Sequence, residues 1–478
     1  MALGDFQVVI GLEVHAQLLT QSKLFSSAPT RFGAEPNSQT QPLCLGMPGT
    51  LPVLNQRVVE MAVRTGLALG CRINEVSLWA RKHYFYPDLP KGYQITQFEQ
   101  PICEWGALAF ELEGIEKSVR VRRIHIEEDA GKSIHDAGGG VSLVDLNRAG
   151  TPLLEIVSEP DLRSADEAVE YLKSLREVLV YLGVNDGNLE EGSFRCDANV
   201  SVMRKSAQEL GTRTELKNLN SFRFIKQAVE WETARQVDVI ESGGKVSQET
   251  RLWDPARNET RSMRSKEDAH DYRYFPEPDL PPLALEPGFV ERQRATLPEL
   301  PRARRRRFVE AVGITDSDAR ILCADKPLAD FFEATLPHAP DAKKLAHWFN
   351  GELQRLFNDS GSQVSQAKFT PAQLGALLTA VETGVISGNA GKEVLGEVFR
   401  TGADPAAVIA QKGLGQVSDS LAIEAAVDEI LARHPEEAAQ FKAGKLQVLG
   451  FLVGNVMKAM KGKGNPRLVN EVLKKKLS

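Results

Sequence analysis

The sequence has few cysteines and no long apolar run. Its 478 residues contain five cysteines, and this small, odd number gives no disulfide framework. We therefore expect a reduced, cytoplasmic setting. No stretch approaches the 18 apolar residues of a membrane span, and residues 1–10 lack the basic and apolar regions of a signal peptide. We expect no membrane partner.

Common catalytic motifs are also absent. Gly131-Lys132-Ser133 resembles the end of a P-loop, but the motif needs glycine at position 126, which is Ile126 here. No G-x-G-x-x-G follows an expected strand, and no G-x-S-x-G nucleophile elbow occurs. Any use of ATP therefore requires a different fold.

Charge is low overall but unevenly placed. The net charge of −6 argues against a general nucleic-acid binder. Residues 441–478 contain nine Lys or Arg and one acid, Glu471, so this end is near +8 and the rest is near −14. A basic end on an acidic body suits a protein that docks phosphate there, and a solvated lysine-rich helix face fits equally well.

Two segments alternate between apolar and polar residues, as strands with one buried face do. In residues 7–18 the even-numbered positions are apolar, whereas Glu13 and His15 lie on the opposite face. Residues 194–202 repeat the pattern with Asp197 on the polar face. We expect two strands, each with one face in a core and the other in a polar site or solvent.

Helical spacing occurs between these strands. Residues 164–181 carry apolar side chains at helical intervals after Ser164, a candidate N-cap, with Glu167 three residues later as in a capping box. Because strands and helices mix without a strict βαβ order, we predict an α+β domain with a largely antiparallel sheet.

The later part of the chain has an all-helical pattern. A proline-rich stretch at residues 274–287 blocks helices and marks a boundary. Beyond it we predict an all-α region with a break near Thr401. The predicted domains are a catalytic domain at 1–292, a helical domain at 293–404 and a small α-helical tail domain at 405–478.

Acidic residues and histidine gather in three places. Glu13 and His15 share a strand face, residues 125–132 place three acids beside a histidine, and Asp197 lies on another polar face. Adjacent carboxylates repel each other and call for a cation unless they are solvated. The oxygen-rich set suits Mg²⁺ better than Zn²⁺. Taken singly, each group fits ordinary surface polarity, and only convergence in space decides.

The alternation of apolar and polar residues before residue 127 is interrupted once, so that the apolar positions shift by one residue. The slip falls near Arg122 and Arg123 and is typical of a β-bulge. Spacing alone therefore leaves open which of Glu127 and Glu128 faces Glu13.

Three further segments allow two interpretations each. The aromatic, proline-broken segments 82–94 and 271–279 could cover a substrate or stack on a base, or could pack their rings inward. The basic run RARRRR at 302–307 fits a solvated helix face, with RNA phosphate contact as the alternative.

Nine motifs occur in order along the chain, namely residues 10–15 (IGLEVH), 35–38 (EPNS), 84–88 (YFYPD), 93–97 (YQITQ), 125–132 (HIEEDAGK), 145–152 (DLNRAGTP), 195–199 (RCDAN), 215–221 (ELKNLNS) and 271–278 (DYRYFPEP). Together with the basic end, they closely resemble the B-subunit family of the bacterial GatCAB tRNA-dependent amidotransferases.

The resemblance implies a fold and an activity. An N-terminal cradle domain, similar to the catalytic fold of glutamine synthetase and guanidino kinases, would hold the active site. Helical and tail domains would help to hold tRNA. With ATP and Mg²⁺, the B subunit would phosphorylate the side-chain carboxylate of misacylated Glu-tRNA(Gln), Asp-tRNA(Asn) or both. Ammonia from the glutaminase A subunit would then displace phosphate, in a heterotrimer completed by a small C subunit.

The resemblance also implies site residues. Matched motif by motif, the family's metal ligands and catalytic residues correspond to Glu13, His15, Glu128 and Asp197. For phosphate neutralisation we add, on charge alone, Lys82, Lys132, Arg148 and Arg195.

One motif departs from part of the family. Some members carry C-P-x-C, consistent with a zinc site, where this chain has Gln41-Pro-Leu-Cys44. Cys44, Cys71 and Cys103 could still bind zinc with a fourth ligand. We expect buried, unreactive cysteines instead.

Two other functions fit part of the sequence. A free-standing small-molecule kinase or ligase of the glutamine-synthetase type fits the acidic set but leaves the helical region and basic end without a role. A non-catalytic RNA scaffold leaves the clustered acids without a reason, since buried carboxylates are costly unless a cation needs them.

Overall fold

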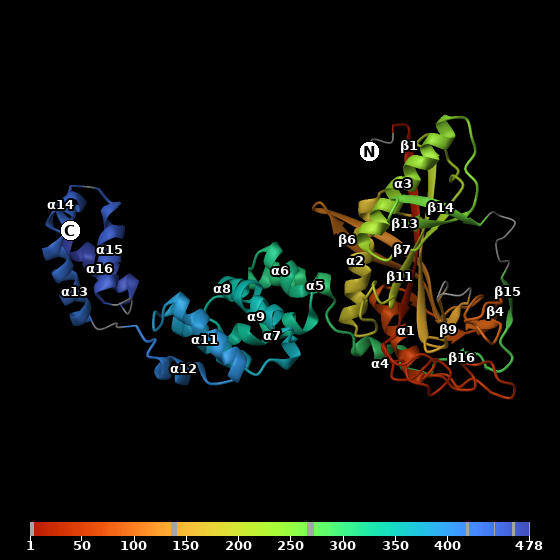
Figure 1. The fold of residues 1–478 in the computed structure, drawn as a ribbon, viewed down its shortest axis with the longest axis horizontal. Helices are drawn as coiled ribbons and strands as arrows, with labels where there is room; N and C mark the ends of the chain where they lie inside the picture. Colours follow the sequence, from red (N-terminus) through yellow and green to blue (C-terminus); the bar gives the residue numbers. More distant parts are fainter. Residues whose placement is uncertain are drawn as a thin grey trace. The chain divides into compact units, whose positions relative to one another are not determined.

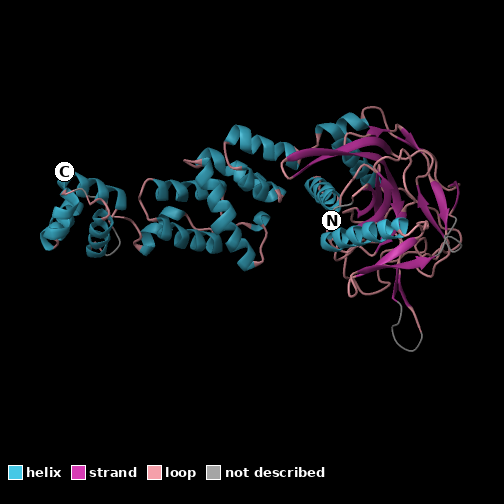
Figure 2. Ribbon diagram, turned by 90° about the horizontal axis from the view of Figure 1, so that it is seen from above, coloured by secondary structure: helices cyan, strands magenta, loops and turns pink. Residues whose placement is uncertain are grey.

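The structure, a computed structural model, describes residues 4–134, 141–264, 272–416, 420–443, 445–460 and 464–477. The chain forms two compact units, residues 1–300 and 301–478 (Figure 1). All the strands drawn belong to the first unit, and the described part of the second consists of helices and loops (Figure 2). The predicted α+β class is confirmed. None of the described helices is long and apolar enough to cross a membrane.

The first unit is built on a nine-stranded sheet. Neighbouring strands are antiparallel except for one parallel pair, β12 and β13, so the prediction of a largely antiparallel sheet is confirmed. In order across the sheet, the strands are β14 (Glu259–Arg264), β13 (Thr250–Asp254), β12 (Thr214–Lys217), β11 (Phe194–Arg204), β1 (Phe6–Gln17), β10 (Pro152–Ser158), β7 (Ile115–Glu128), β6 (Cys103–Leu112) and β2 (Arg72–Ile73).

One face of this sheet is apolar. Even-numbered residues of β1 from Val8 to Ala16 are buried, as their alternation predicts. They share a single core with apolar residues of the long helices. These helices are α1 (Gln56–Ala68), α2 (Ala165–Tyr181) and α3 (Phe222–Glu241). The opposite face of β1 is therefore left for polar side chains.

Helix α2 begins where its sequence predicts. The hydroxyl of Ser164 accepts a hydrogen bond from the Glu167 backbone N–H at 3.1 Å, which confirms the N-cap. The Glu167 carboxylate accepts from the Arg163 N–H at 2.6 Å, one residue before the cap. A complete capping box would have the Glu167 carboxylate accept from the Ser164 N–H, but here it accepts from the N–H of the preceding residue.

Smaller ladders complete the first unit. A three-stranded sheet has the order β15 (Arg273–Pro276), β4 (Ala80–His83) and β5 (Tyr93–Thr96). Two-stranded ladders pair β16 (Leu283–Ala284) with β3 (Val76–Ser77), and β8 (Lys132–Ile134) with β9 (Leu143–Asp145). Helix α4 (Phe289–Ala295) lies near the end of the unit and packs its aromatic and aliphatic side chains against the same core.

The described part of the second unit contains two separate hydrophobic cores. One gathers buried residues between Phe308 and Val408, and the other between Ile423 and Leu477. The boundaries predicted at 292/293 and 404/405 stay predictions. The helices and turns are α5 (Pro301–Arg307), η2 (Phe308–Val312), α6 (Asp316–Cys323), α7 (Lys326–Thr335), η3 (Leu336–His338), α8 (Ala342–Trp348), η4 (Phe349–Leu353), α9 (Gln354–Ser360), η5 (Val364–Gln366), α10 (Pro371–Glu382), α11 (Gly388–Thr401), α12 (Pro405–Lys412), α13 (Ser420–Arg433), α14 (Pro435–Lys442), α15 (Val448–Ala459) and α16 (Pro466–Leu477).

Arginines of the basic run in α5 form ion pairs with acidic residues of the second unit. Arg304 is only 5 % exposed and its guanidinium contacts Asp330 and Glu333 at 2.5 and 2.7 Å. Arg305 pairs with Asp316 at 2.7 Å. A solvated helix face is therefore the wrong interpretation at Arg304, whereas the Arg306 side chain is 76 % exposed.

Candidate active site in the first unit

Strand register aligns polar side chains across the sheet. His125, Glu155, His15 and Arg195 lie directly opposite one another on β7, β10, β1 and β11. Opposed residues in such a ladder have Cβ atoms about 4.5–5.5 Å apart and point to the same face. Four strands distant in sequence therefore contribute to one row on the face away from the three long helices.

A second row runs beside the first. Glu13 is opposite Asp197 on β11 and opposite Val157 on β10, and Val157 is in turn opposite Arg123 on β7. Asp197 also contacts the Nζ of Lys217 on β12. Glu13, His15 and Asp197, which the sequence places far apart, thus converge on one face.

The predicted bulge in β7 is present and decides which glutamate faces this site. Ser158 pairs with Val121 but Val157 pairs with Arg123, so Arg122 is the extra residue. After the bulge, His125 and Glu127 point to the polar face. Glu128, the next residue along the strand, points to the opposite face.

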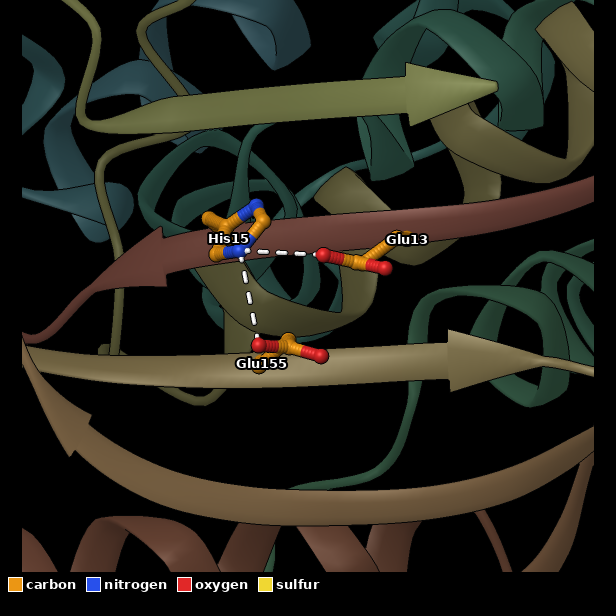
Figure 3. Close-up of side chains that lie close together, drawn as sticks. All are labelled: Glu13, His15 and Glu155. Carbon is orange, nitrogen blue, oxygen red and sulfur yellow. Dashed lines mark ion pairs between the residues drawn. The ribbon is translucent and has the colours of Figure 1, made fainter. Parts of the chain in front are cut away.

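The side chains of Glu13, His15 and Glu155 form a compact group. His15 Nε2 lies 3.5 Å from a Glu13 carboxylate oxygen and 3.6 Å from one of Glu155. Figure 3 shows Glu13 and His15 on β1 with the Glu155 carboxylate reaching toward the imidazole from β10. The three ligand atoms all lie within 4.8 Å of one another, which is close enough to share one metal ion.

A second group shares Glu155 with the first. His125 Nε2 lies 3.3 Å from Glu155 Oε2 and 3.7 Å from Glu127 Oε2. The other ring nitrogen of His125, Nδ1, is buried without a hydrogen-bond partner among the described residues. Three carboxylates and two histidines in one buried patch form a donor set that fits a divalent cation.

Burial and charge oppose each other in this patch. Burial, followed by the charge of Glu155, raises the pKa of Glu13 to about 7. Burial alone lowers the pKa of His15, but the Glu155 carboxylate 3.6 Å away and the other nearby carboxylates outweigh burial and raise it to about 9. Burial also opposes ionisation of Glu155, yet the two histidines hold its pKa well below the ordinary value.

The patch forms part of a cavity of about 730 Å³. Glu13, His15, Glu155 and Asp197 lie on its sheet side. Aromatic residues of the three-stranded sheet and its loops line another part, and residues of β12 and β13 a third. The space is large enough for a substrate of some size beside the carboxylates.

The residues expected from the sequence do not all reach this cavity. Lys82 lines it, and neighbouring carboxylates, Glu127 foremost, raise its pKa although burial acts against this. The other three expected cations and Glu128 are not among its lining residues. Glu128 is buried and accepts hydrogen bonds from Lys91 Nζ and, at 2.9 Å, from the Ile95 N–H. The face that carries His15 therefore excludes Glu128.

The remaining expected cations have local partners. Asp129 accepts a hydrogen bond from Arg195 at 2.8 Å and lies 3.7 Å from Arg148. The Arg148 guanidinium also donates to two backbone carbonyls, those of residues 130 and 131. Lys132 is exposed on β8. Two of the three thus organise the chain beside the site.

Cys44, Cys71 and Cys103 are buried, as expected. Burial raises the pKa of Cys71 to about 12 and that of Cys103 well above its ordinary value. Cys44 is close to the Lys23 ammonium, 3.5 Å from Nζ. Among the described residues, the groups that could share a metal ion contain no cysteine.

Sequence reasoning missed two residues of this site, Glu155 and Lys217, whereas it singled out the acids beside His125 and left Glu127 as an open alternative to Glu128. Glu155 is a single acid inside an apolar strand, PLLEIVS. That isolation is a usable signal, because an apolar strand buried on both faces has no place for an unpaired carboxylate. Lys217 gave no comparable signal, since only the pairing of β11 with β12 brings it beside Asp197.

Comparison with known proteins agrees with this site. The sequence model of the GatB/GatE catalytic domain matches residues 8–291, and that of the GatB domain matches residues 330–477. The chain belongs to the GatB family. The resemblance found from the nine motifs is therefore confirmed, and the whole cavity lies within the matched catalytic domain.

Curated members of the GatB family align over the full chain. The B subunit of an aspartyl/glutamyl-tRNA(Asn/Gln) amidotransferase from Myxococcus xanthus is 69 % identical over 477 residues, with 100 % of both chains covered. The protein of the same name from Anaeromyxobacter dehalogenans is 62 % identical with the same coverage. That from Geotalea uraniireducens is 58 % identical over 99 % of each chain.

Proposed function

We propose that this chain is the B subunit of a tRNA-dependent amidotransferase that acts on Glu-tRNA(Gln), Asp-tRNA(Asn) or both. The observation that carries the proposal is the group of Glu13, His15 and Glu155 on the floor of a large cavity. Relatives of equal length that bear this name support it. Because those relatives are named as subunits, they also support work in a multi-subunit complex, for which we propose a glutaminase A subunit and a small C subunit.

The proposed reaction has two steps. An oxygen of the side-chain carboxylate attacks the γ-phosphorus of ATP, so a P–O bond forms and ADP leaves. Ammonia released from glutamine then attacks the acyl carbon, phosphate leaves with the bonding electrons, and the nitrogen loses a proton. The products are the amide on tRNA, ADP and phosphate. Holding both reactants in one water-poor cavity is the main contribution that a protein makes to such a transfer.

We assign a Mg²⁺ ion to the carboxylate patch. Glu13, His15, Asp197 and Glu155 would hold it, and the close approach of the ligand atoms of Glu13, His15 and Glu155 supports this. When bound, the ion neutralises charge on the phosphates. Glu128 belongs to the expected set of ligands. Because its side chain points to the opposite face of the sheet, we propose Glu155 in its place.

The chain's own cations complete the proposed site. Lys82 would neutralise transferring phosphate, since it lines the cavity and is held in its charged form by Glu127. Arg195 and Arg148 would act indirectly, by fixing the loop around Asp129. Lys132 remains a proposal on charge alone.

The basic C-terminal end is proposed to contact tRNA phosphates. Lys476 is engaged with Asp428 at 2.6 Å, so this lysine is at least partly neutralised within its own bundle. Lys474 and Lys475 precede it at the end of α16, and the three form the basic run that we propose for RNA contact.

The deciding experiment is amidation of Glu-tRNA(Gln) and Asp-tRNA(Asn) by the co-expressed three-subunit complex. The variant His15→Ala is compared with Gln7→Ala, a change on the same strand and the same face eight residues away. Glutaminase output is followed separately. We expect His15→Ala to abolish amidation and leave glutamine hydrolysis, while Gln7→Ala retains both.

Two results would overturn the proposal. Lack of amidated tRNA from the unsubstituted complex with ATP, Mg²⁺ and glutamine would refute the activity itself. Full amidation by His15→Ala would move the catalytic centre elsewhere. Phosphorylation of free glutamate without RNA would instead favour a small-molecule ligase of the glutamine-synthetase type.

A further inference from the structure

One part of the cavity is lined by aromatic rings, some of them exposed. Phe98, which follows β5, stacks on Tyr274 of β15 with ring centroids 4.0 Å apart and planes 13° from parallel. Both residues line the cavity. Tyr84 and Tyr86 from the loop after β4 line it as well. Large rings gathered at a polar cavity need a reason beyond core packing.

Phe98 remains exposed at the cavity although Tyr274 covers one face of its ring. Its exposed fraction is 46 %. Among the described residues its ring has no second aromatic partner. The exposed ring therefore offers a flat apolar surface of the kind on which a nucleobase stacks.

A cation lies next to this surface. The Arg123 guanidinium donates a hydrogen bond to the Gln97 carbonyl at 2.6 Å, one residue before Phe98. Arg123 also lines the cavity, and its Nε is buried without a hydrogen-bond partner among the described residues. A guanidinium with an unused donor beside a stacking surface suits a phosphate or ribose oxygen of a nucleotide.

The distance to the carboxylates also fits a nucleotide. Arg123 and Glu13 lie in one row, two strands apart across β10. Two strand spacings amount to about 10 Å. A base on Phe98 would therefore place its own phosphate chain, or an attached 3′-ester, toward Glu13 and Asp197.

Resting on the proposed function, we propose that Phe98, backed by Tyr274 and flanked by Arg123, is the stacking surface for an adenine base in this active site. Two reactants of the amidation carry an adenosine: ATP itself and the 3′ end of the aminoacyl-tRNA. The chemistry of recognition is the same for both, and the experiment distinguishes them.

The structure supplies a matched control for Phe98. Phe275 is 47 % exposed, belongs to β15 and stacks on His83 at 4.4 Å. It is next to Tyr274 in sequence, so it points to the opposite face of the small sheet, and it does not line the cavity. Leucine at either position keeps an apolar side chain but removes the planar ring.

The test compares Phe98→Leu, Phe98→Trp and Phe275→Leu in the assembled complex. Dissociation constants are measured for a non-hydrolysable ATP analogue, for uncharged tRNA(Gln), and for the same uncharged tRNA without its 3′-terminal adenosine. Stacking on one ring contributes enough to weaken binding by about 5- to 140-fold when the ring is removed. Phe98→Trp should bind as tightly as the unsubstituted complex, and so should Phe275→Leu.

Each outcome decides the proposal. Weaker binding of the ATP analogue alone by Phe98→Leu assigns the base to ATP. Weaker tRNA binding that disappears with the truncated tRNA assigns it to the 3′ end. Unchanged constants, or a weakening that Phe275→Leu shares, overturn the stacking surface. Amidation by the unsubstituted complex is measured alongside, so that failure of the proposed function is seen separately.

Discussion

The aromatic part of the cavity depends on one buried ion pair. Arg81 on β4 contacts Glu277, just beyond β15, through Nε–Oε2 at 2.8 Å and Nη2–Oε1 at 2.9 Å. The Glu277 side chain is 0 % exposed. The hydrogen bonds from Arg81 to Glu277 raise the pKa of Arg81. The pair fastens the end of β15, and with it Tyr274, to the rest of the small sheet.

We predict that Arg81→Met destabilises the first unit by about 3 kcal/mol. Removing one partner of a buried pair costs roughly 3–5 kcal/mol, because the other charge stays buried and unpaired. Glu277 would keep one hydrogen bond, from the Asp279 N–H at 2.9 Å, so the lower end of this range applies. Methionine retains the packing of the arginine stem. For a unit of this size the melting temperature should fall by about 5 °C.

The measurement is thermal unfolding of the assembled complex, with Arg120→Met as the matched control. Arg120 makes an equally short two-point contact with Asp161, at 2.8 and 2.6 Å, but its side chain is 69 % exposed. Water solvates the Arg120 guanidinium there, and Asp161 keeps the hydrogen bond from the Arg120 backbone N–H, so we expect no resolvable change in melting temperature. Equal shifts for the two variants would refute the argument that burial decides the effect.

Other parts of the chain carry three further predictions. Glu155→Gln should raise the Mg²⁺ concentration for half-maximal amidation at least about tenfold, whereas Glu128→Gln should not; the reverse order would place Glu128 in the metal site. Ser164→Ala should lower the free energy of unfolding by about 1 kcal/mol through loss of the α2 cap, and an unchanged denaturant midpoint would contradict this. Replacing Lys474 and Lys475 by alanine should make the plot of log tRNA affinity against log salt concentration less steep. The slope should change by roughly 0.7–0.9 for each phosphate that is no longer neutralised. An unchanged slope would remove both lysines from the interface.

Much of the local structure follows from short-range pattern. The alternation in β1 predicts its burial because adjacent strand residues point to opposite faces. Ser164 predicts the start of α2 because its hydroxyl satisfies a backbone N–H that the helix leaves free. The bulge in β7 is visible as a slip in the pattern near Arg122.

Charged runs are less informative by themselves. RARRRR has the composition of a solvated or RNA-binding face, yet its members pair with acids from α6 and α7. Those acids lie 11 to 29 residues along the chain from the arginines that they contact, and no local rule connects the two. Only helix packing brings the charges together.

The sequence by itself determined the α+β class, the polar face of β1 and, through its ordered motifs, the family. Only the tertiary structure decided that Glu127 and not Glu128 faces His15, and that Glu155 completes the carboxylate group. The physical reason is register. Which side chains meet across a sheet depends on how separate strands pair, and a one-residue bulge reverses the face of every residue that follows it.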